Sequence, residues 1–395
     1  MLSFLTVPLL ALTLSLPAFA APSRHVRRAT SNPVASAYYT GWHASEDAPL
    51  SAVPWDKYNT LIYAFAETTP SVHEITLNGS APEVFPQFVT EAHKHNVRAH
   101  IGIGGWTGGR WFSSNVATAE NRTAFANTIN NFVERYDLDG VNLDWEYPGK
   151  QGVGCNVVNS NDSANFLEFI QELRQTLNEK VTLTAVVPLT PYQSDMTGYA
   201  KILDYIVLMN EDVWGSWSSS ANKWDQLCGV NAWTKAGFAL AKIVLSVPSY
   251  GRSYSISPSN VFVEGSSDQL VSYPPFNASN QPLGDDWSGT GGMDVCGVYQ
   301  GPGDTWNFRG LVQEGWLTNC GVPAEGIDYR FDNCSKTPYI YSKTSGVMIS
   351  YDNAESFAAK GQYISSEGLL GFSMWEEGGD HNDILLDSIR KAAGF

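Results

Sequence analysis

Eight short apolar runs, separated by stretches with helical periodicity, constrain the fold of this chain more than any other feature. Amphipathic helices fit between several runs, for instance Ala117 to Tyr136 and Ser163 to Lys180. Eight strands that alternate with helices predict an α/β fold, a (β/α)8 TIM barrel, and a doubly wound sheet is the alternative on this pattern alone. The predicted strands are ASAYYTG (35–41), TLIYAFA (60–66), VRAHIGI (97–103), DGVNLDW (139–145), VTLTAVV (181–187), DYIVLMN (204–210), KIVLSVP (242–248) and GLLGFSMW (368–375).

The alternation is interrupted once, between the seventh and eighth strands. Residues 253–345 are rich in Gly, Pro, Ser and aromatic residues, and this length predicts a small α+β insertion between barrel segments 35–252 and 346–395. Three of the five cysteines lie in it, where a small unit would gain most from a cross-link. The cysteines are Cys155, Cys228, Cys296, Cys320 and Cys334, an odd number that leaves at least one thiol unpaired.

The N-terminus predicts export. Residues 1–20 carry an apolar run too short to span a bilayer and end in Ala18-Phe19-Ala20, a small-x-small cleavage pattern. Residues 21–34 contain Arg27-Arg28, a candidate second trimming site, and no later segment is long and apolar enough to cross a membrane. The expected product is a secreted, extracellular glycoprotein with acceptor sites at Asn78, Asn121, Asn161, Asn277 and Asn333, each followed by x-Ser or x-Thr.

The composition and net charge limit the classes of molecule that this protein can bind. A formal net charge of −16 argues against nucleic acid and anionic membrane surfaces, which need clustered Lys and Arg, and leaves neutral sugars open. No Cys or His spacing suggests zinc, so we expect no metal and no cofactor. We also expect a monomer. The 13 Trp fit either core packing or the lining of a carbohydrate groove, and their number does not choose between these.

The fourth predicted strand carries an unusual polar face. In LDGVNLDWEYPG (138–149), Val141, Leu143 and Trp145 point one way, so Asn142, Asp144 and Glu146 point the other. Burying polar groups on one face of an apolar strand costs free energy, so such groups are expected to have a function. Two carboxyl groups two residues apart suit general acid catalysis at the carboxyl end of a barrel strand, although paired structural carboxylates are common as well.

This stretch resembles the signature of glycoside hydrolase family 18, the retaining chitinases, written D-G-x-D-x-D-x-E. Six further segments are similar to the family, several to its fungal members, and they follow its order: YYTGW (38–42), YAFA (63–66), GIGGWTGGRWFS (102–113), MNEDVWGSW (209–217), PSYGR (248–252) and SMW (373–375). The resemblance covers nearly the whole chain after the predicted signal peptide.

The resemblance implies a substrate-assisted mechanism, an exception to the usual two-carboxylate scheme. Glu146 would protonate the glycosidic oxygen, the acetamido carbonyl of the substrate would attack the anomeric carbon, and Asp144 would orient the acetamido N–H. Trp375 would form the floor beneath the sugar. The other implied substrate-binding residues are Tyr38, Phe65, Trp106, Met209, Asp212, Tyr250 and Arg252.

Three positions depart from the family pattern. Asn142 replaces an inner Asp that would share a proton with Asp144, and Gly102 replaces the Ser that supports this Asp. Glu211 replaces a Tyr whose hydroxyl donates to the acetamido oxygen. An ionised Glu cannot donate, although a protonated Glu211 could do so in place of the Tyr. Removing one positioned donor costs roughly 100- to 1000-fold in rate.

The departures predict a secreted chitinase-like protein that binds chitin or chitooligosaccharides, with hydrolysis absent or strongly reduced. A role in holding chitin fragments away from other receptors would follow from the resemblance. The alternatives are an active retaining endochitinase, favoured by Asp144, Glu146 and Trp375, and a hydrolase of N-linked glycans.

Overall fold

The eight apolar runs form one closed parallel sheet in the computed structural model, which describes residues 32–44, 48–213, 215, 217–218 and 227–395, with only the backbone at 227 and 228. The strands lie in the order β1-β16-β8-β7-β6-β5-β4-β2, and β1 pairs with β2 to close the barrel. The predicted barrel is therefore confirmed, and the doubly wound sheet is wrong. The barrel strands are β1 (Val34–Thr40), β2 (Thr60–Thr68), β4 (Arg98–Gly104), β5 (Gly140–Asp144), β6 (Thr182–Val187), β7 (Tyr205–Leu208), β8 (Ile243–Pro248) and β16 (Gly371–Trp375).

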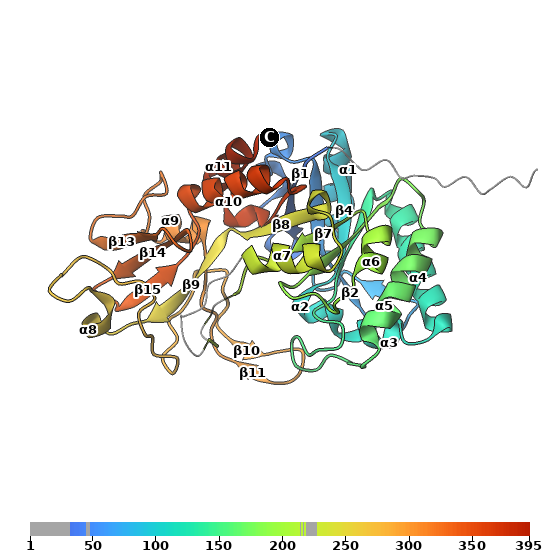
Figure 1. Cartoon of the computed structure of the whole chain (residues 1–395), viewed down its shortest axis with the longest axis horizontal. Coiled ribbons are helices and arrows are strands. Elements are labelled where there is room, and N and C mark those ends of the chain that lie inside the picture. Colours follow the sequence, from blue (N-terminus) through green and yellow to red (C-terminus); the bar gives the residue numbers. More distant parts are fainter. Residues whose placement is uncertain (1–31, 45–47, 214, 216, 219–226) are drawn as a thin grey trace, which may run out of the picture. The chain divides into compact units, whose positions relative to one another are not determined.

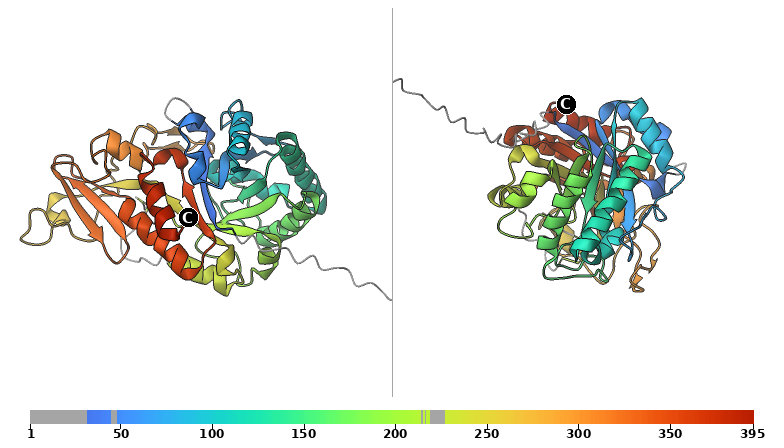
Figure 2. Two further views of the ribbon diagram at one scale, coloured as in Figure 1. Left: turned by 90° about the horizontal axis from the view of Figure 1, so that it is seen from above. Right: turned by 90° about the vertical axis from the view of Figure 1, so that its right-hand side faces the viewer.

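Helices cover the outside of this barrel (Figure 1, Figure 2). The strand β3 (Ile75–Thr76) adds to the edge of β2, and short 3-10 turns occupy Gly41–His43, Leu50–Ala52, Trp55–Lys57, Gly109–Trp111, Leu240–Lys242 and Glu377–Gly379. The helices are α1 (Phe85–Lys94), α2 (Gly105–Gly108), α3 (Phe112–Asn115), α4 (Ala119–Tyr136), α5 (Asp162–Thr176), α6 (Thr197–Ile202), α7 (Leu227–Lys235), α10 (Ala354–Glu367) and α11 (Ile384–Ala393). In the part of the chain that is described, none of them is long and apolar enough to cross a bilayer.

Local sequence explains where the covering helices begin and end. The Thr118 side chain accepts from the backbone N–H of Asn121 at the start of α4. At the start of α10, Asn353 and Ser356 form a reciprocal capping box, and Gly368 ends that helix at φ 70°. These caps set the length of the helices that alternate with the strands.

The barrel has two apolar layers, as alternating side chains require. On β5, Val141 and Leu143 pack outward against the helices. Trp145, directly after β5, also packs outward, and its ring stacks on Phe112 with centroids 5.3 Å apart. The inward layer contains Tyr38 and Phe65 and continues to the partly buried Met209 and Trp375. The inner core therefore ends in aromatic and sulfur-containing side chains at the carboxyl ends of the strands.

The segment between β8 and β16 contains a second, antiparallel sheet with the order β12-β9-β15-β14-β13. Figure 1 shows β9, β13, β14 and β15 together to one side of the barrel strands. The elements of this segment are β9 (Tyr250–Ser255), α8 (Pro258–Val261), β10 (Gly292–Met293), β11 (Tyr299–Gln300), β12 (Thr305–Asn307), α9 (Phe308–Gln313), β13 (Ile327–Asp332), β14 (Thr337–Ser342) and β15 (Val347–Ser350).

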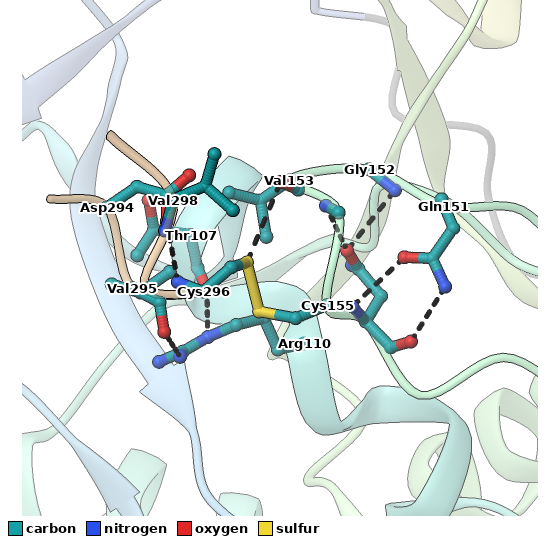
Figure 3. Close-up of a disulfide and its surroundings, with 12 residues drawn as sticks. Thr107, Arg110, Gln151, Gly152, Val153, Cys155, Asp294, Val295, Cys296 and Val298 are labelled. Atoms are coloured by element: carbon teal, nitrogen blue, oxygen red, sulfur yellow. Dashed lines mark hydrogen bonds between the residues drawn. A yellow bond between two sulfur atoms is a disulfide. The ribbon is translucent and has the colours of Figure 1, made fainter. Parts of the chain in front are cut away.

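One disulfide joins this segment to the barrel (Figure 3). Cys155, in the loop after β5, is bonded to Cys296, between β10 and β11, across 141 residues of sequence. The pairing, which the sequence left open, thus links Cys296 to the barrel and not to another cysteine of the insertion, because the β10–β11 hairpin reaches a barrel loop. Cys320 and Cys334 are free and exposed. The side chain of Cys228 lies outside the described residues.

The remaining sequence predictions concern the N-terminal segment and the glycosylation positions. The predicted signal peptide and trimming site lie within 1–31, outside the described residues. Four of the predicted glycosylation positions are exposed: Asn78, Asn161, Asn277 and Asn333. The fifth, Asn121, is half-buried in α4, and its amide donates to the carbonyl of Ser114 over 2.8 Å.

Candidate functional site

A cleft of about 470 Å³ opens at the carboxyl ends of the barrel strands. A neighbouring recess of about 840 Å³ shares Trp106, Glu146, Met209, Glu211 and Asp212 with it. The sequence-predicted residues that line the cleft are Tyr38, Phe65, Trp106, Asp144, Glu146, Met209, Glu211, Asp212, Tyr250 and Trp375, and Arg252 lines the recess. The chain thus brings most of the predicted site residues together from strands far apart in sequence.

The floor of the cleft is aromatic. The ring of Trp375 stacks on Phe65 with centroids 5.6 Å apart and lies 5.1 Å from Tyr38. Trp42 lies 6.2 Å from Trp375 and is 44% exposed, and Trp106 is 50% exposed. Aromatic faces that are accessible and fixed by packing are suited to stacking on the apolar face of a ring.

Asn142 lies at the bottom of this floor, fully buried inside the barrel. Its Oδ1 accepts from the Tyr38 hydroxyl over 3.0 Å, and its Nδ2 donates to Thr184 Oγ1 over 2.8 Å. Thr184 in turn donates to the carbonyl of Val141 over 3.3 Å. The amide is thus held between β1 and β6, and its nitrogen donates to Thr184 and not to Asp144.

Asp144 and Glu146 stand above Asn142. Asp144 Oδ1 is buried without a hydrogen-bond partner among the described residues. Burial, Glu146 and Glu211 together hold the pKa of Asp144 well above its usual range. Burial raises the pKa of Glu146 to about 7, with Tyr147 acting against this rise and Asp212 adding to it. A carboxyl group in this range is protonated in much of the population at neutral pH.

Glu211 faces the same cleft from the loop after β7. Ser246 of β8 donates its hydroxyl to Glu211 Oε1 over 2.6 Å, and Oε2 is buried without a partner in the described part of the chain. Burial raises the pKa of Glu211 to about 8, despite the bond from Ser246, and Asp212 raises it further. The carboxyl group is therefore neutral at neutral pH, which is the form that the sequence left open as the alternative.

Arg252 is fully engaged by carboxylates at the edge of the cleft. Its Nε and one terminal nitrogen donate to Asp212 Oδ1 over 2.8 and 2.7 Å, and its other terminal nitrogen donates to Asp304 over 2.6 Å. The guanidinium group also lies 4.7 Å from the ring centre of Trp217. This ion-pair network joins the loop after β7 to β9 and to Asp304, the residue before β12.

Gly102 lies below Phe65 and outside the cleft lining. A Cβ atom at this position would lie 2.8 Å from Cδ1 of Phe65 and 3.2 Å from the carbonyl oxygen of Tyr63. A serine at 102 would therefore require the Phe65 ring to move. The absence of a side chain at position 102 therefore allows the Phe65 ring to occupy its present position in the floor of the cleft.

The loop that carries the disulfide reaches the backbone of the site. Asn156, next to Cys155, is buried and donates to the carbonyl of Glu146 over 3.1 Å. On the other side of the cross-link, Arg110 donates to the carbonyl of Val295 over 3.4 Å (Figure 3). The β10–β11 hairpin is therefore connected to the residue predicted as the general acid.

Sequence reasoning missed several cleft residues, among them Trp42, Glu67 and Ser246. Trp42 belongs to the quoted YYTGW segment, so its position directly after a strand was an available signal. Ser246 alternates on β8 with outward apolar residues, and this period of two places it inside the barrel. Among the described residues, no group of three or more His, Cys, Asp and Glu side chains could hold a metal ion.

Comparisons with known proteins agree with this fold. Residues 34–380 match the family model described as glycosyl hydrolases family 18. The chain is 43% identical over 384 residues to a "chitinase-like effector" of Moniliophthora roreri, with 92% of this chain and 93% of the relative covered. It is 41% identical over 390 residues to a "chitinase-like effector" of Moniliophthora perniciosa, with 93% and 88% covered.

A solved chitinase from Rhizomucor miehei superimposes with a TM-score of 0.80 at 30% identity, and the match covers 91% of this chain and 99% of that one. The family model spans every barrel strand from β1 to β16. The chain belongs to family 18 of the glycosyl hydrolases.

Proposed function

We propose that this protein is secreted and binds chitin or chitooligosaccharides in the cleft, with hydrolysis absent or strongly reduced. Two relatives above 40% identity are called chitinase-like effectors, a description that fits a secreted protein of this family. The aromatic floor of Trp375, Phe65 and Tyr38 suits the apolar faces of N-acetylglucosamine units. Holding chitin fragments away from other receptors is the role that this binding would serve.

The observation that carries the loss of hydrolysis is the isolation of Asp144. In the family mechanism this residue would orient the acetamido N–H and stabilise the positively charged oxazolinium intermediate. Here Asn142 cannot share a proton with it, because an amide does not ionise and its donor bond goes to Thr184. The raised pKa of Asp144 favours its neutral form, which offers no charge to the intermediate.

One observation favours the alternative, an active retaining endochitinase. The pKa of Glu146, raised by burial to about 7, keeps a proton available at the position of the general acid. Binding and catalysis depend on different residues, so the two functions can be separated by experiment. Trp375 serves both functions, whereas proton transfer depends on Glu146.

The test measures binding and turnover of chitin hexamer with the same preparation. Calorimetry of the wild type is expected to show binding, and product analysis is expected to show turnover at least about 1000-fold below that of active chitinases. Trp375→Ala should weaken binding, because stacking supplies apolar burial. Glu146→Gln should abolish any residual turnover.

Two results would reject this proposal. A wild type that hydrolyses hexamer at rates typical of enzymes would establish the alternative. A folded wild type that ignores hexamer, or a Trp375→Ala variant that binds equally well, would remove the binding function.

A further inference from the structure

The Glu211 carboxyl group is buried, and only one of its two oxygens has a partner. Ser246 Oγ donates to Oε1 over 2.6 Å, and Oε2 has no hydrogen-bond partner among the described residues. A buried polar atom without a partner is rare and calls for a specific explanation. Glu211 also lines the cleft beside Asp144, Glu146 and Met209, so a ligand in the cleft can supply the missing partner.

Among the described residues, the cations near Glu211 are bonded to other carboxyl groups. Arg252 is bonded to Asp212 and Asp304, and Lys360 of α10 is bonded to Asp352 over 2.6 Å. Most of the other titratable groups around Glu211 are carboxyl and phenol groups. The titratable and charged groups that face Glu211 are Tyr38 of β1, Asp144 and Glu146 at the end of β5, Asp212 beside it, Tyr250 and Arg252 of β9, and Lys360 of α10.

This environment favours the neutral acid. Loss of the proton would place a negative charge in a dry site among other carboxyl groups. Burial therefore raises the pKa of Glu211 to about 8, while Ser246 and the backbone of Asn210 act in the opposite direction. Because Ser246 donates to Oε1, the acid proton is available on Oε2.

We propose that Glu211 is a specificity-determining residue that recognises the N-acetyl group of the ligand as a neutral carboxylic acid, with Oε2–H donating to the acetamido oxygen. This inference rests on the proposed chitooligosaccharide binding and assigns it a donor. It also makes binding sensitive to pH. Above the pKa of Glu211, two acceptor oxygens would face each other and the affinity would fall.

The experiment compares calorimetric affinities for chitin hexamer at pH 6 and pH 9.5. The wild type is expected to bind roughly ten- to hundredfold more weakly at pH 9.5, the range that one buried hydrogen bond supports. Glu211→Gln carries an amide that donates at either pH, so its loss of affinity between the two pH values should be smaller than that of the wild type. The part that remains comes from Asp144 and Glu146, whose pKa values are also raised. Glu67→Gln, which alters another carboxyl group of the cleft, is the matched control and should retain the pH dependence of the wild type.

A neutral glucose hexamer tests the acceptor. It lacks the acetamido oxygen and should bind the wild type at least tenfold more weakly than chitin hexamer at pH 6. A further measurement tests the protonation of Glu211 in a protein that retains this residue. At pH 9, binding of chitin hexamer to Glu146→Gln should take up a proton, counted from calorimetry in buffers of different ionisation enthalpy.

The outcomes separate the two proposals. A folded wild type that does not bind chitin hexamer at pH 6 overturns both of them. If the wild type binds, then any one of three results overturns the role of Glu211 alone. These are a pH dependence as large in Glu211→Gln as in the wild type, equal binding of the glucose hexamer, or the absence of proton uptake.

Discussion

Replacing Asn142 by Asp would restore the acid of the family pattern, and the structure predicts that this change destabilises the protein in a pH-dependent way. Asn142 is fully buried, between the Tyr38 hydroxyl and Thr184 Oγ1. A carboxyl group there keeps the bond from Tyr38, loses the donor to Thr184 and lies near the already acidic Asp144. Its charged form is therefore disfavoured, and its pKa in the folded protein is raised.

The magnitude follows from this burial. A rise of ~3 units is within the range of buried carboxyl groups, and each unit corresponds to about 1.4 kcal/mol. In the unfolded chain the carboxyl group titrates near its ordinary value of ~3.9. The penalty is thus absent well below that pH and complete above the folded pKa. We expect a loss of about 1 kcal/mol at pH 4.5 and about 4 kcal/mol at pH 8 in Asn142→Asp.

The assay is urea unfolding followed by tryptophan fluorescence at the two pH values. Asn142→Ala is the control, because it removes both hydrogen bonds of Asn142 without adding an ionisable group, and its penalty should be the same at both pH values. An equal penalty for Asn142→Asp at pH 4.5 and pH 8 would refute the reasoning, since it would mean that position 142 is not a dry site. At pH 5, the protonated group can bond to Asp144, so the variant should also turn over chitin hexamer faster than the wild type.

Three further changes test other contacts. Gly102→Ser should lower the melting temperature and weaken hexamer binding, because its Cβ would meet the Phe65 ring at 2.8 Å; unchanged values would show that the ring moves at no cost. Replacing Cys155 and Cys296 by Ser should reduce the free energy of unfolding by about 5 kcal/mol in denaturant titrations, since the bond closes a loop over 141 residues; an equally stable variant would contradict this. In secreted protein, mass spectrometry of glycopeptides should find Asn121 unoccupied, because its side-chain amide is bonded to the carbonyl of Ser114 in α3.

Much of the fold was predictable because the alternation of strands and helices along the chain follows from local hydrophobic patterns. Each apolar run became a barrel strand, and the period of two on β5 separated outward Val141 and Leu143 from inward Asn142 and Asp144. The family segments predicted which strand ends would meet, since parallel strands place their carboxyl ends at one face of a barrel. These features follow from residue type and spacing along the chain.

The tertiary structure alone decided the features that depend on distant neighbours. The partner of Cys155 is a cysteine on a hairpin of another segment, and no spacing rule selects Cys296 from the other cysteines. The donor bond of Asn142 goes to Thr184 because β6 lies beside β5. The sequence shows only that residue 211 is a glutamate. In the structure its carboxyl group is buried against Ser246, and the cations near it among the described residues are bonded to other carboxyl groups. Its pKa is therefore raised, and the group is neutral at neutral pH. Protonation depends on desolvation and on nearby charges, and both are fixed only when the chain has folded.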